Sequence, residues 1–354
     1  MTQTQIDGTD YTLRAQRPEG AEVAVVILNW NGRHLLEEYL PQVVANTDAI
    51  GAVTMADNGS TDDSKEWTHS HFPGVIQLSF SRNHGFAEGY NMALRLAAEA
   101  GFRYVVLLNS DVAPAPGWLR PLYDYMEAHP EVAACQPKIL SYRNKDTFEY
   151  AGASGGFIDR NGYPYCRGRL FDTCEKDMGQ YDTVEYIDWA SGAAMMVRTD
   201  EYNAAGGLDA SFFAHMEEID LCWRMRLRGR KIAVVPRSVV YHLGGGSLPP
   251  SDPRKTYLNF RNNLLMLYKN LPAKGRRSRM LRRKLLDGVA GIKYLLSGNL
   301  QGMWAIVRAH RDFDRMKRQI APRSADDHAA CDDQRRPDIL KEYYLLGHRR
   351  YSRL

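Results

Sequence analysis

Two acidic segments of the sequence contain residues that could bind a metal ion or act as a general base. The first, Asn109-Ser110-Asp111, directly follows the apolar run Tyr104–Leu108, so a carboxylate stands where a buried strand would end. Mg²⁺ and Mn²⁺ prefer such hard oxygen ligands and bridge them to phosphate oxygens. Taken alone, Asp111 is equally well explained as the start of a turn before two prolines.

The second acidic segment is the pair Glu217 and Glu218, followed by Asp220. Such acids are ionised at neutral pH, with an unperturbed pKa of about 4.3. Two neighbouring acids that face a cleft can supply a general base, which takes a proton from an attacking hydroxyl. Asp220 has a simpler explanation, because Arg224 lies one helical turn later and can form an ion pair with it.

His242 is a third candidate. It follows the apolar residues Val239–Tyr241 and precedes Gly244–Gly246. Neutral imidazole is a common metal ligand, and consecutive glycines can form a nest that binds phosphate. A single histidine before a glycine turn is more often structural, so the sequence leaves both interpretations open.

Two polar turns complete the set. Asp57 begins one of them, and its carboxylate could accept the ring N–H of a uracil or thymine; the alternative is a turn that only caps the next helix. The other turn, Ser81–Gly85, opens a helix whose free N–H groups favour phosphate. Because this turn is not a GxGxxG motif, a dinucleotide cofactor is not indicated.

The elements that must position these residues alternate between strand and helix. Strands are predicted by the apolar runs Val23–Leu28, Ala52–Ala56, Val75–Phe80, Tyr104–Leu108 and Val132–Pro137, with helical spacing between them. Such alternation predicts an α/β fold with a mostly parallel sheet, which binds ligands beyond the carboxyl ends of its strands. Pro41 is expected to kink or interrupt the first helix.

The rest of the chain divides into less regular segments. Residues 140–185 predict an irregular excursion over the sheet, and Glu218–Arg228 and Ile232–Val235 predict a helix and a strand. From Asp252 onward the pattern is helical, and the tail after Pro322 is polar enough to be loosely ordered. We therefore expect a polar segment (1–21), a catalytic domain (22–250), a helical basic extension (251–322) and a polar tail (323–354).

Composition excludes several classes of protein. The net charge of +4 over 354 residues is too small to indicate nucleic-acid binding. The five cysteines include no CxxC pair, which argues against a disulfide scaffold or a zinc cluster and fits a reducing compartment. Without an apolar signal core or a long apolar span, the sequence predicts a cytoplasmic protein.

A basic segment stands out in the C-terminal part. Residues 274–284 contain seven Lys or Arg and no acid, and leucine, valine and isoleucine recur at helical spacing over 285–296. A basic cluster beside an amphipathic helix can lie on an anionic membrane surface. The alternative is a helical cap that packs on the catalytic domain and exposes a basic face.

Taken together, these segments resemble GT-A-fold glycosyltransferases of family 2, especially bacterial rhamnosyltransferase-like members. The resemblance covers about residues 22–250 and rests on segments in family order: VVILNWNG (25–32), ADNGSTD (56–62), RNHGFAEGYN (82–91), LLNSD (107–111), SGAAMMVR (191–198), GGLDASFF (206–213), EEIDLCWR (217–224) and YHLGGGS (241–247). Single motifs of this kind are weak, but their joint order is specific.

The resemblance implies a role for each matching residue. It implies a Mg²⁺ or Mn²⁺ site at Asp111 and His242, Glu218 as catalytic base with Glu217 as its rival, and Trp189 as an acceptor-stacking residue whose alternative is a core aromatic. Nucleotide-sugar contacts are implied for Leu28, Asn29, Asp57, Asn83, Gly85, Asn91 and Ser110. Two positions depart from the family pattern: Asn109 replaces the first acid of the metal motif, and Glu218 stands where Asp is commoner.

The implied activity is inverting transfer of a sugar from a dTDP- or UDP-linked donor to a hydroxyl of a glycan or polyprenyl-linked acceptor. Cell-envelope polysaccharide synthesis is the expected setting, with peripheral contact at the inner face of the cytoplasmic membrane. Two alternatives remain at this stage. One is a nucleotidyltransferase, for which the expected basic Gly-rich entry loop is missing, and the other is a catalytically silent nucleotide-sugar-binding protein.

Overall fold

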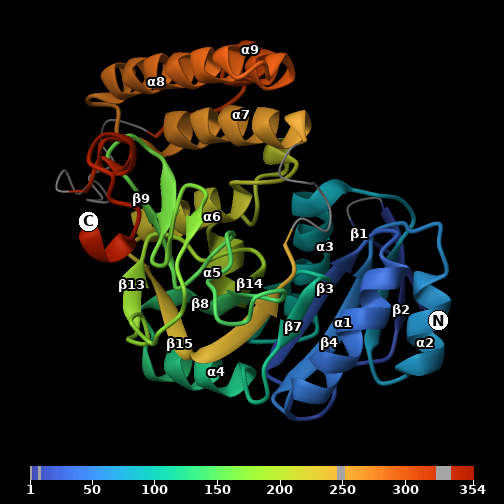
Figure 1. Cartoon of the computed structure of the whole chain (residues 1–354). Coiled ribbons are helices and arrows are strands. Elements are labelled where there is room, and N and C mark those ends of the chain that lie inside the picture. Colours follow the sequence, from blue (N-terminus) through green and yellow to red (C-terminus); the bar gives the residue numbers. More distant parts are fainter. Residues whose placement is uncertain (1, 7–8, 245–251, 324–335) are drawn as a thin grey trace.

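A large mixed sheet forms the centre of the molecule, with helices on both faces and three C-terminal helices outside it (Figure 1). The structure is a computed structural model that describes residues 2–6, 9–244, 252–323 and 336–354. The strands of the large sheet are β1 (Thr2–Ile6), β2 (Thr9–Arg14), β3 (Val23–Asn29), β4 (Gly51–Asp57), β5 (Ile76–Phe80), β6 (Tyr104–Leu108), β7 (Val112–Pro114), β8 (Val132–Ser141), β13 (Glu185–Ile187), β14 (Ala194–Arg198) and β15 (Lys231–His242). The helices are α1 (Arg33–Asn46), α2 (Ser64–His71), α3 (Gly85–Glu99), α4 (Leu119–Ala128), α5 (Thr199–Ala204), α6 (Glu217–Leu227), α7 (Pro253–Asn270), α8 (Arg276–Leu296) and α9 (Leu300–Met316).

Strand order decides which loops meet. The path is β1-β2-β5-β4-β3-β6-β14-β8-β15-β13, with β7 paired to β15, and the run β5-β4-β3-β6 is parallel. Strand β14 is antiparallel to β6, with Ala194 opposite Leu108. The residues just before β14 therefore lie at the same sheet edge as the residues that follow β3, β4 and β6.

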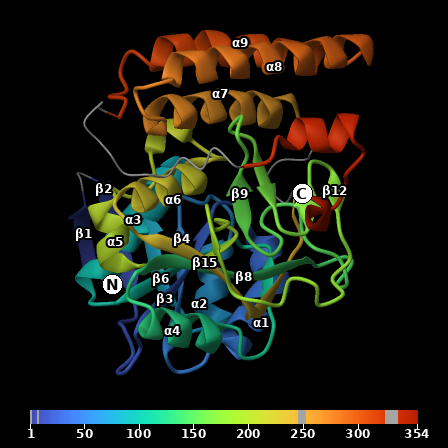
Figure 2. The same cartoon turned by 90° about the vertical axis from the view of Figure 1, so that its left-hand side faces the viewer.

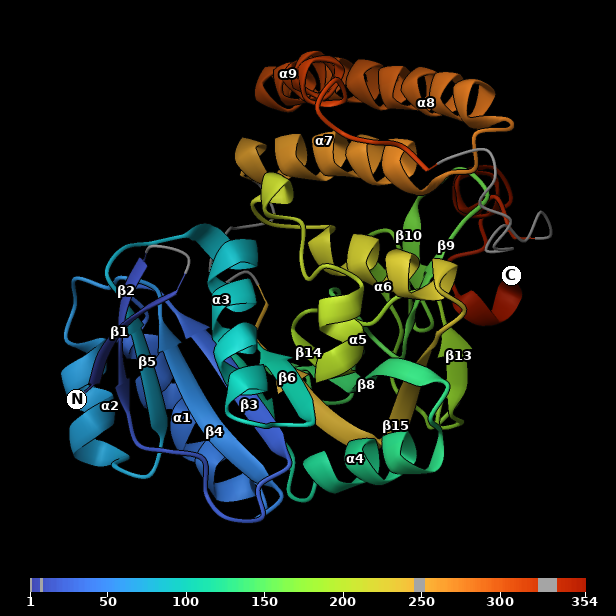
Figure 3. The ribbon, with the colours of Figure 1, turned by 180° about the vertical axis from the view of Figure 1, so that it is seen from behind.

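The two faces of the sheet bury separate apolar layers. Along β3, Val23, Val25 and Ile27 pack with α1 and α4, whereas Ala24 and Val26 pack with α3 and α6 on the other face. Alternation to opposite faces is the geometry of a strand, and burial of both faces explains why the parallel strands are continuously apolar. Figure 3 shows α3, α5 and α6 covering one face, and Figure 1 shows α1 and α4 on the other.

The predicted α/β class and the C-terminal helices are confirmed, but the first helix is not interrupted where the sequence allowed for it. Helix α1 runs through Pro41 without interruption. Proline removes one helical hydrogen bond, and the burial of Leu36, Leu40 and Val43 against the sheet offsets that loss. The polar N-terminal segment also contains strands, because β2 pairs with β5 and extends the sheet.

The segment 140–185 is more ordered than its sequence indicates. It contains a small antiparallel sheet of β9 (Gly156–Ile158), β10 (Pro164–Cys166), β11 (Arg169–Leu170) and β12 (Thr173–Cys174). The described tail, 336–354, packs on this sheet and includes a short π-helix (Lys341–Leu345) and a 3₁₀ turn (Tyr351–Arg353). Tyr351 stacks on Phe157 at 5.6 Å between ring centroids, so the expectation of a loose tail is wrong for these residues.

Helices α7, α8 and α9 form layers above the sheet domain (Figure 2). Helix α7 contacts α6, and α8 and α9 pack on the outer side of α7. Asp252 caps α7 by accepting a hydrogen bond from the Arg254 amide, with Pro253 at the first helical position. In the described part of the chain, no helix is long and apolar enough to cross a bilayer.

Candidate active site

The first pole of the site is a histidine held between two acids. His242, at the end of β15, places Nε2 3.1 Å from an oxygen of Asp111 and Nδ1 3.2 Å from an oxygen of Glu149. Asn109 adds its amide nitrogen 3.4 Å from Nε2. Pairing of β15 with β7, in which His242 lies opposite Val112, brings the histidine to Asp111 across a large sequence separation.

These residues fit a divalent cation that also binds substrate phosphates. A histidine ligand commonly has its second ring nitrogen held by a carboxylate, as Glu149 holds Nδ1 here. Mg²⁺ typically uses one or two protein ligands and completes its shell with phosphate oxygens and water. Among the described residues, no group of three His, Cys, Asp or Glu side chains is placed to hold a metal ion, so Asp111 and His242 would depend on such substrate ligands.

The charge of His242 depends on its neighbours. Burial disfavours the imidazolium, but the hydrogen bonds and charges of Asp111 and Glu149 outweigh burial and raise the pKa of His242 to about 10. The ring is therefore protonated in the metal-free protein at neutral pH. Metal binding at Nε2 would release that proton.

The second pole is the acidic start of α6. Burial raises the pKa of Glu218 to about 7, and burial together with the charge of Glu218 raises the pKa of Glu217 well above its usual range. Glu217 is 4% exposed, whereas Glu218 is only partly buried. Glu218 also lies beside Gly192, where a Cβ atom would meet the Glu218 side chain at 3.6 Å.

A strained loop sets the direction in which these acids point. Phe213, His215 and Met216 all have positive φ, which is costly for residues with side chains. Asn262 of α7, fully buried, holds the loop by donating to the carbonyls of Phe212, Ala214 and His215. The sequence contained no signal for this role, because an asparagine inside a helix has no characteristic pattern.

Backbone pairing links the two poles. The amide of Asn109 donates to the carbonyl of Ala193 at 3.0 Å, and Ala193 follows Gly192, the residue in contact with Glu218. Asn109 in turn reaches His242. The metal-binding candidates and the candidate base therefore lie on either side of one short backbone contact, between the end of β6 and the start of β14.

The predicted nucleotide-contacting residues lie along the same edge. Asn29 and Asp57 face each other at the ends of β3 and β4, and strands lie roughly 4.8 Å apart, so Asp57 is about 10 Å from the end of β6. Asp57 has no exposed surface and accepts hydrogen bonds from Asn29 and from the Ser60 amide. Contact between Asp57 and a base would require this loop to shift, and this role stays a prediction.

The glycine turn before α3 has the predicted conformation. Gly85 has φ of +79°, which other residues rarely adopt, and begins the helix. Exposed Asn83 accepts a hydrogen bond from the Gly85 amide at 2.7 Å, and Asn58 ties this turn to the one after β4. Leu28 and Ser110 are both half-buried near these loops.

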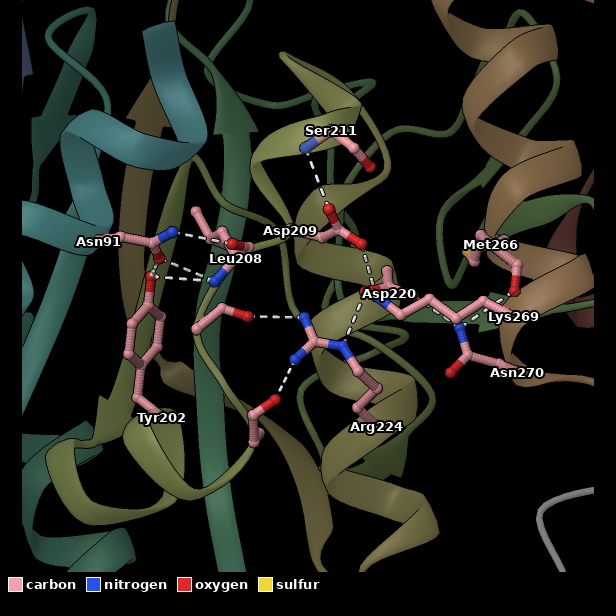
Figure 4. A network of polar contacts seen from close by, with 12 residues as sticks. Asn91, Tyr202, Leu208, Asp209, Ser211, Asp220, Arg224, Met266, Lys269 and Asn270 are labelled. Atoms are coloured by element: carbon pink, nitrogen blue, oxygen red, sulfur yellow. Dashed lines mark hydrogen bonds and ion pairs between the residues drawn. The ribbon is translucent and has the colours of Figure 1, made fainter. Parts of the chain in front are cut away.

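Asn91 departs from its predicted role. Its side-chain amide accepts from Tyr202 and from the Leu208 amide and donates to the Leu208 carbonyl, as Figure 4 shows. All of these bonds hold the turn before α6 against α3. We therefore replace the expected contact with the nucleotide-sugar by a positioning role.

Trp189 is a second correction. The predicted acceptor-stacking ring is 3% exposed, and its indole N–H donates to the Phe157 carbonyl. A Cβ atom on Gly156 would lie only 2.1 Å from the ring, so the indole fills the space above that glycine. Trp189 is a core residue, and no face of it is available to a sugar.

The expected glycine nest after His242 is described only in part. Gly244 has φ of +70°, and a Cβ atom there would lie 2.7 Å from Glu149, so the backbone passes close to the acid that supports His242. Gly245, Gly246 and Ser247 lie outside the described residues. The nest therefore stays a prediction.

Comparisons with known proteins agree with the fold. Residues 24–183 match the profile of Glycosyl transferase family 2. An N-acetylglucosaminyl-diphospho-decaprenol L-rhamnosyltransferase of Mycobacterium tuberculosis is 27% identical over 233 residues, which cover 62% of this chain and 75% of that protein. Rhamnosyltransferase WbbL of Escherichia coli is 24% identical over 216 residues, covering 59% of this chain and 80% of that protein.

Solved structures show the same fold at low sequence identity. S. aureus TarS has a TM-score of 0.54 and 14% identity, and GalNAc-T7 with UDP, GalNAc and Mn²⁺ has a TM-score of 0.53 and 16% identity. They match 83% and 71% of this chain, which in turn spans about half of theirs (49% and 48%). At this identity the likeness establishes the GT-A-type fold.

The fold is thus that of GT-A-type glycosyltransferases. Residues 24–183 are similar to Glycosyl transferase family 2, and both relatives named above are sugar transferases. The two named relatives transfer sugars, which favours sugar transfer over nucleotidyl transfer, one of the alternatives from the sequence.

Proposed function

We propose that the enzyme moves a sugar from a dTDP- or UDP-linked donor to a hydroxyl of a glycan or polyprenyl-linked acceptor, with inversion, during cell-envelope polysaccharide synthesis. One observation carries this proposal. The hydrogen bond from the Asn109 amide to the Ala193 carbonyl has Asp111 and His242 on one side and Glu218 on the other. The mycobacterial relative, which is named for a diphospho-decaprenol acceptor, supports the polyprenyl-linked acceptor class, and both relatives are named for transfer of rhamnose.

The proposed reaction is a single displacement. The acceptor oxygen attacks the anomeric carbon while its proton passes to Glu218, and the bond from that carbon to the nucleoside diphosphate breaks. Attack from the face opposite the leaving group inverts the anomeric configuration. Holding both substrates between the two poles removes much of the entropic barrier, and a base with a pKa of about 7 is matched to neutral pH.

Asp111 and His242 are the proposed ligands of Mg²⁺ or Mn²⁺, with Glu149 orienting His242. When bound, the ion would neutralise charge on the diphosphate leaving group. The chain's own contribution is to keep the imidazole directed at Asp111 and to bury both groups, which are 5% and 6% exposed.

A metal-dependence experiment tests the proposal. We expect Mn²⁺ to strengthen UDP or dTDP binding to the wild type and to support release of nucleoside diphosphate from a sugar nucleotide in a full donor panel. Asp111→Asn should lower this turnover roughly 100-fold or more, because it removes the anionic ligand. Nucleotide affinity measured without metal serves as the control and should be equal in both proteins. If no donor turns over in the wild type, the silent-binding alternative is supported instead.

We also propose that α8 and α9 contact the membrane that carries the acceptor. Helix α8 has an inverted distribution of side chains: it buries Met280, Arg283 and Asp287 and exposes apolar side chains. The exposed apolar side chains, each 48–83% exposed, are Leu281, Leu285, Val289, Ile292, Leu295 and Leu296 on α8 and Leu300, Trp304 and Val307 on α9.

This pattern argues against the alternative of a cap that packs its apolar face on the catalytic domain. The inward face of α8 is instead held by polar contacts: Arg283 pairs with Asp287 at 2.8 Å and lies 3.8 Å from the Tyr163 ring, and His310 of α9 reaches Asp287. Exposed Arg282 and Lys293 adjoin the apolar stripe, which suits anionic headgroups. Figures 1 and 3 show α8 and α9 as the outermost layer, beyond α7.

Vesicle binding provides the measurement. The triple variant Leu285→Gln, Val289→Gln, Ile292→Gln should bind vesicles of phosphatidylcholine and phosphatidylglycerol at least about tenfold more weakly than the wild type. Met178→Gln, at another exposed apolar residue (82% exposed), is the matched control and should bind normally. Wild-type binding should fall with salt and with loss of phosphatidylglycerol. A concentration-dependent dimer that the triple variant abolishes, without vesicle binding by the wild type, would mean that a second copy covers this face.

A further inference from the structure

Arg169 is a buried cation that pairs with no acid in the described part of the chain. Its side chain is 6% exposed, and among the described residues no carboxylate pairs with it. The guanidinium contacts the Cys166 sulfur (Nη2–Sγ 3.2 Å) and the Tyr150 ring (Cζ 4.6 Å from the centroid), and Nε has no hydrogen-bond partner in the described part of the chain. Because unpaired buried charge is costly, such a group indicates a missing anion.

The backbone holds this cation in a fixed position. Arg169 lies opposite Cys166 in the tight turn between β10 and β11 and also pairs with Cys174 of β12. The turn depends on Gly168, which has φ of +109° and whose Cβ, if present, would lie 2.7 Å from the Phe148 ring. Pairing with β10 on one side and β12 on the other therefore fixes the position of the residue that carries the guanidinium.

A second cation reaches the same aromatic ring. Lys255 of α7 places Nζ 5.9 Å from the Tyr150 centroid, and within the described ranges it too pairs with no carboxylate. Tyr150 is 47% exposed, so its ring is open to a ligand between the two elements that carry the cations. Two positive groups from separate elements thus converge on one exposed side chain.

The Tyr150 ring lies next to the candidate active site. Tyr150 directly follows Glu149, whose carboxylate lies 3.2 Å from Nδ1 of His242, and a Cβ atom on Gly152 would meet Ser191, the neighbour of Gly192 beside Glu218. Two further polar atoms here, Oε2 of Glu218 and Nε2 of His215, are buried without hydrogen-bond partners among the described residues. Buried polar atoms left unsatisfied together are typical of a site that a ligand completes.

We infer that Arg169, Lys255 and Tyr150 form a subsite for a phosphate or diphosphate group of a substrate, beside Glu218. This inference rests on the proposed function for its setting. Guanidinium binds phosphate oxygens through paired N–H groups, and a lysine adds a point charge. The group could belong to the nucleotide donor or to a lipid-linked acceptor, since both carry a diphosphate.

Titration with inorganic pyrophosphate, without metal, tests the subsite directly. Arg169→Met should weaken pyrophosphate binding on the order of 30-fold or more, and Lys255→Met by a smaller factor, because Lys255 is more exposed. The melting temperature of unliganded Arg169→Met should equal or exceed that of the wild type, since an unpaired buried charge is removed. The matched control is Arg167→Met: Arg167 is similarly buried but donates to the carbonyls of Ser154, Tyr181 and Thr183, so its loss should lower the melting temperature.

Two further ligands identify the source of the diphosphate. If Arg169→Met weakens UDP or dTDP but not geranyl diphosphate, the subsite binds the donor; the opposite result assigns it to the acceptor. Unchanged pyrophosphate affinity in both methionine variants overturns the inference, as does a folded Arg169→Met protein that melts well below the wild type. These readouts need no turnover, so absence of glycosyl transfer would count against the proposed function and leave the subsite to be judged by binding.

Discussion

Glu218→Gln should lower kcat by about 10²–10⁴-fold while leaving nucleotide affinity close to that of the wild type, because it removes a proton acceptor and keeps the size of the side chain. Glu217→Gln should have a much smaller effect. Glu217 is 4% exposed, whereas Glu218 is only partly buried, and burial with the charge of Glu218 raises the pKa of Glu217, which makes it the less accessible acid for an acceptor hydroxyl. A larger loss of kcat in Glu217→Gln than in Glu218→Gln would reverse the assignment.

The pH dependence of kcat tests whether Glu218 is the catalytic base, because the direction of the change with pH is defined. Burial raises the pKa of Glu218 to about 7, and only its ionised form can accept a proton. Wild-type kcat should therefore rise with pH up to about 7 and level off above it, and the residual rate of Glu218→Gln should lack this step. A wild-type kcat that is already maximal at pH 5 would contradict the assignment of Glu218 as the base.

The stability that Glu218 contributes to the folded wild type should fall as pH rises, in the direction opposite to kcat. The pKa of Glu218 is higher in the folded chain than its ordinary value of 4.5, so its contribution to stability is fully present below that value and is lost as pH rises through about 7. Glu218→Gln cannot ionise, so its melting temperature should exceed that of the wild type at pH 8 and approach it at low pH. Thermal melts over this range measure the difference.

Asp220→Ala should lower the free energy of unfolding by about 3–5 kcal/mol, the usual cost of breaking a buried ion pair. The Asp220 carboxylate is fully buried and accepts from Arg224 at 2.7 Å, Lys269 at 3.0 Å and Asn270 at 2.7 Å (Figure 4). Its removal leaves two cations short of an anion at the junction of α6 and α7. Denaturant unfolding measures the change.

A surface acid provides the control for this prediction. Asp124 pairs with Arg120 one helical turn away, and its side chain is 62% exposed. Exposed pairs contribute about 0–1 kcal/mol, so Asp124→Ala should change stability only slightly. If Asp220→Ala lowers the free energy of unfolding by less than about 1 kcal/mol, the prediction is wrong. Lys269 would then be sufficiently stabilised by its other ion pair, with Asp209.

Apolar runs made the parallel half of the sheet predictable. The predicted strand Tyr104–Leu108 coincides with β6, and the helix predicted to follow the turn Ser81–Gly85 begins at Gly85 as α3. Strands buried on both faces are continuous in hydrophobicity and bounded by polar turns, so their pattern is strong. The small sheet was missed because its strands have only two or three residues, too few to show alternation.

Burial decided the roles that side-chain type left open. An indole suits both a core and a sugar-stacking surface, and only the packing of Gly156 against Trp189 shows which applies. Likewise, an amphipathic helix predicts one apolar face but not its direction. In α8 the polar residues Arg283 and Asp287 face inward, which no periodicity could distinguish from the opposite arrangement.

The sequence by itself determined the chemical groups, their order and the positions of the strand ends where they stand, because local hydrophobic pattern and side-chain chemistry are properties of short segments. The tertiary structure alone decided which groups meet. Glu149, Arg169 and Lys255 carried no signal in the sequence, yet β-sheet pairing and the docking of α7 bring Glu149 to His242 and both cations to Tyr150. Contacts between residues so far apart arise from the packing of whole elements.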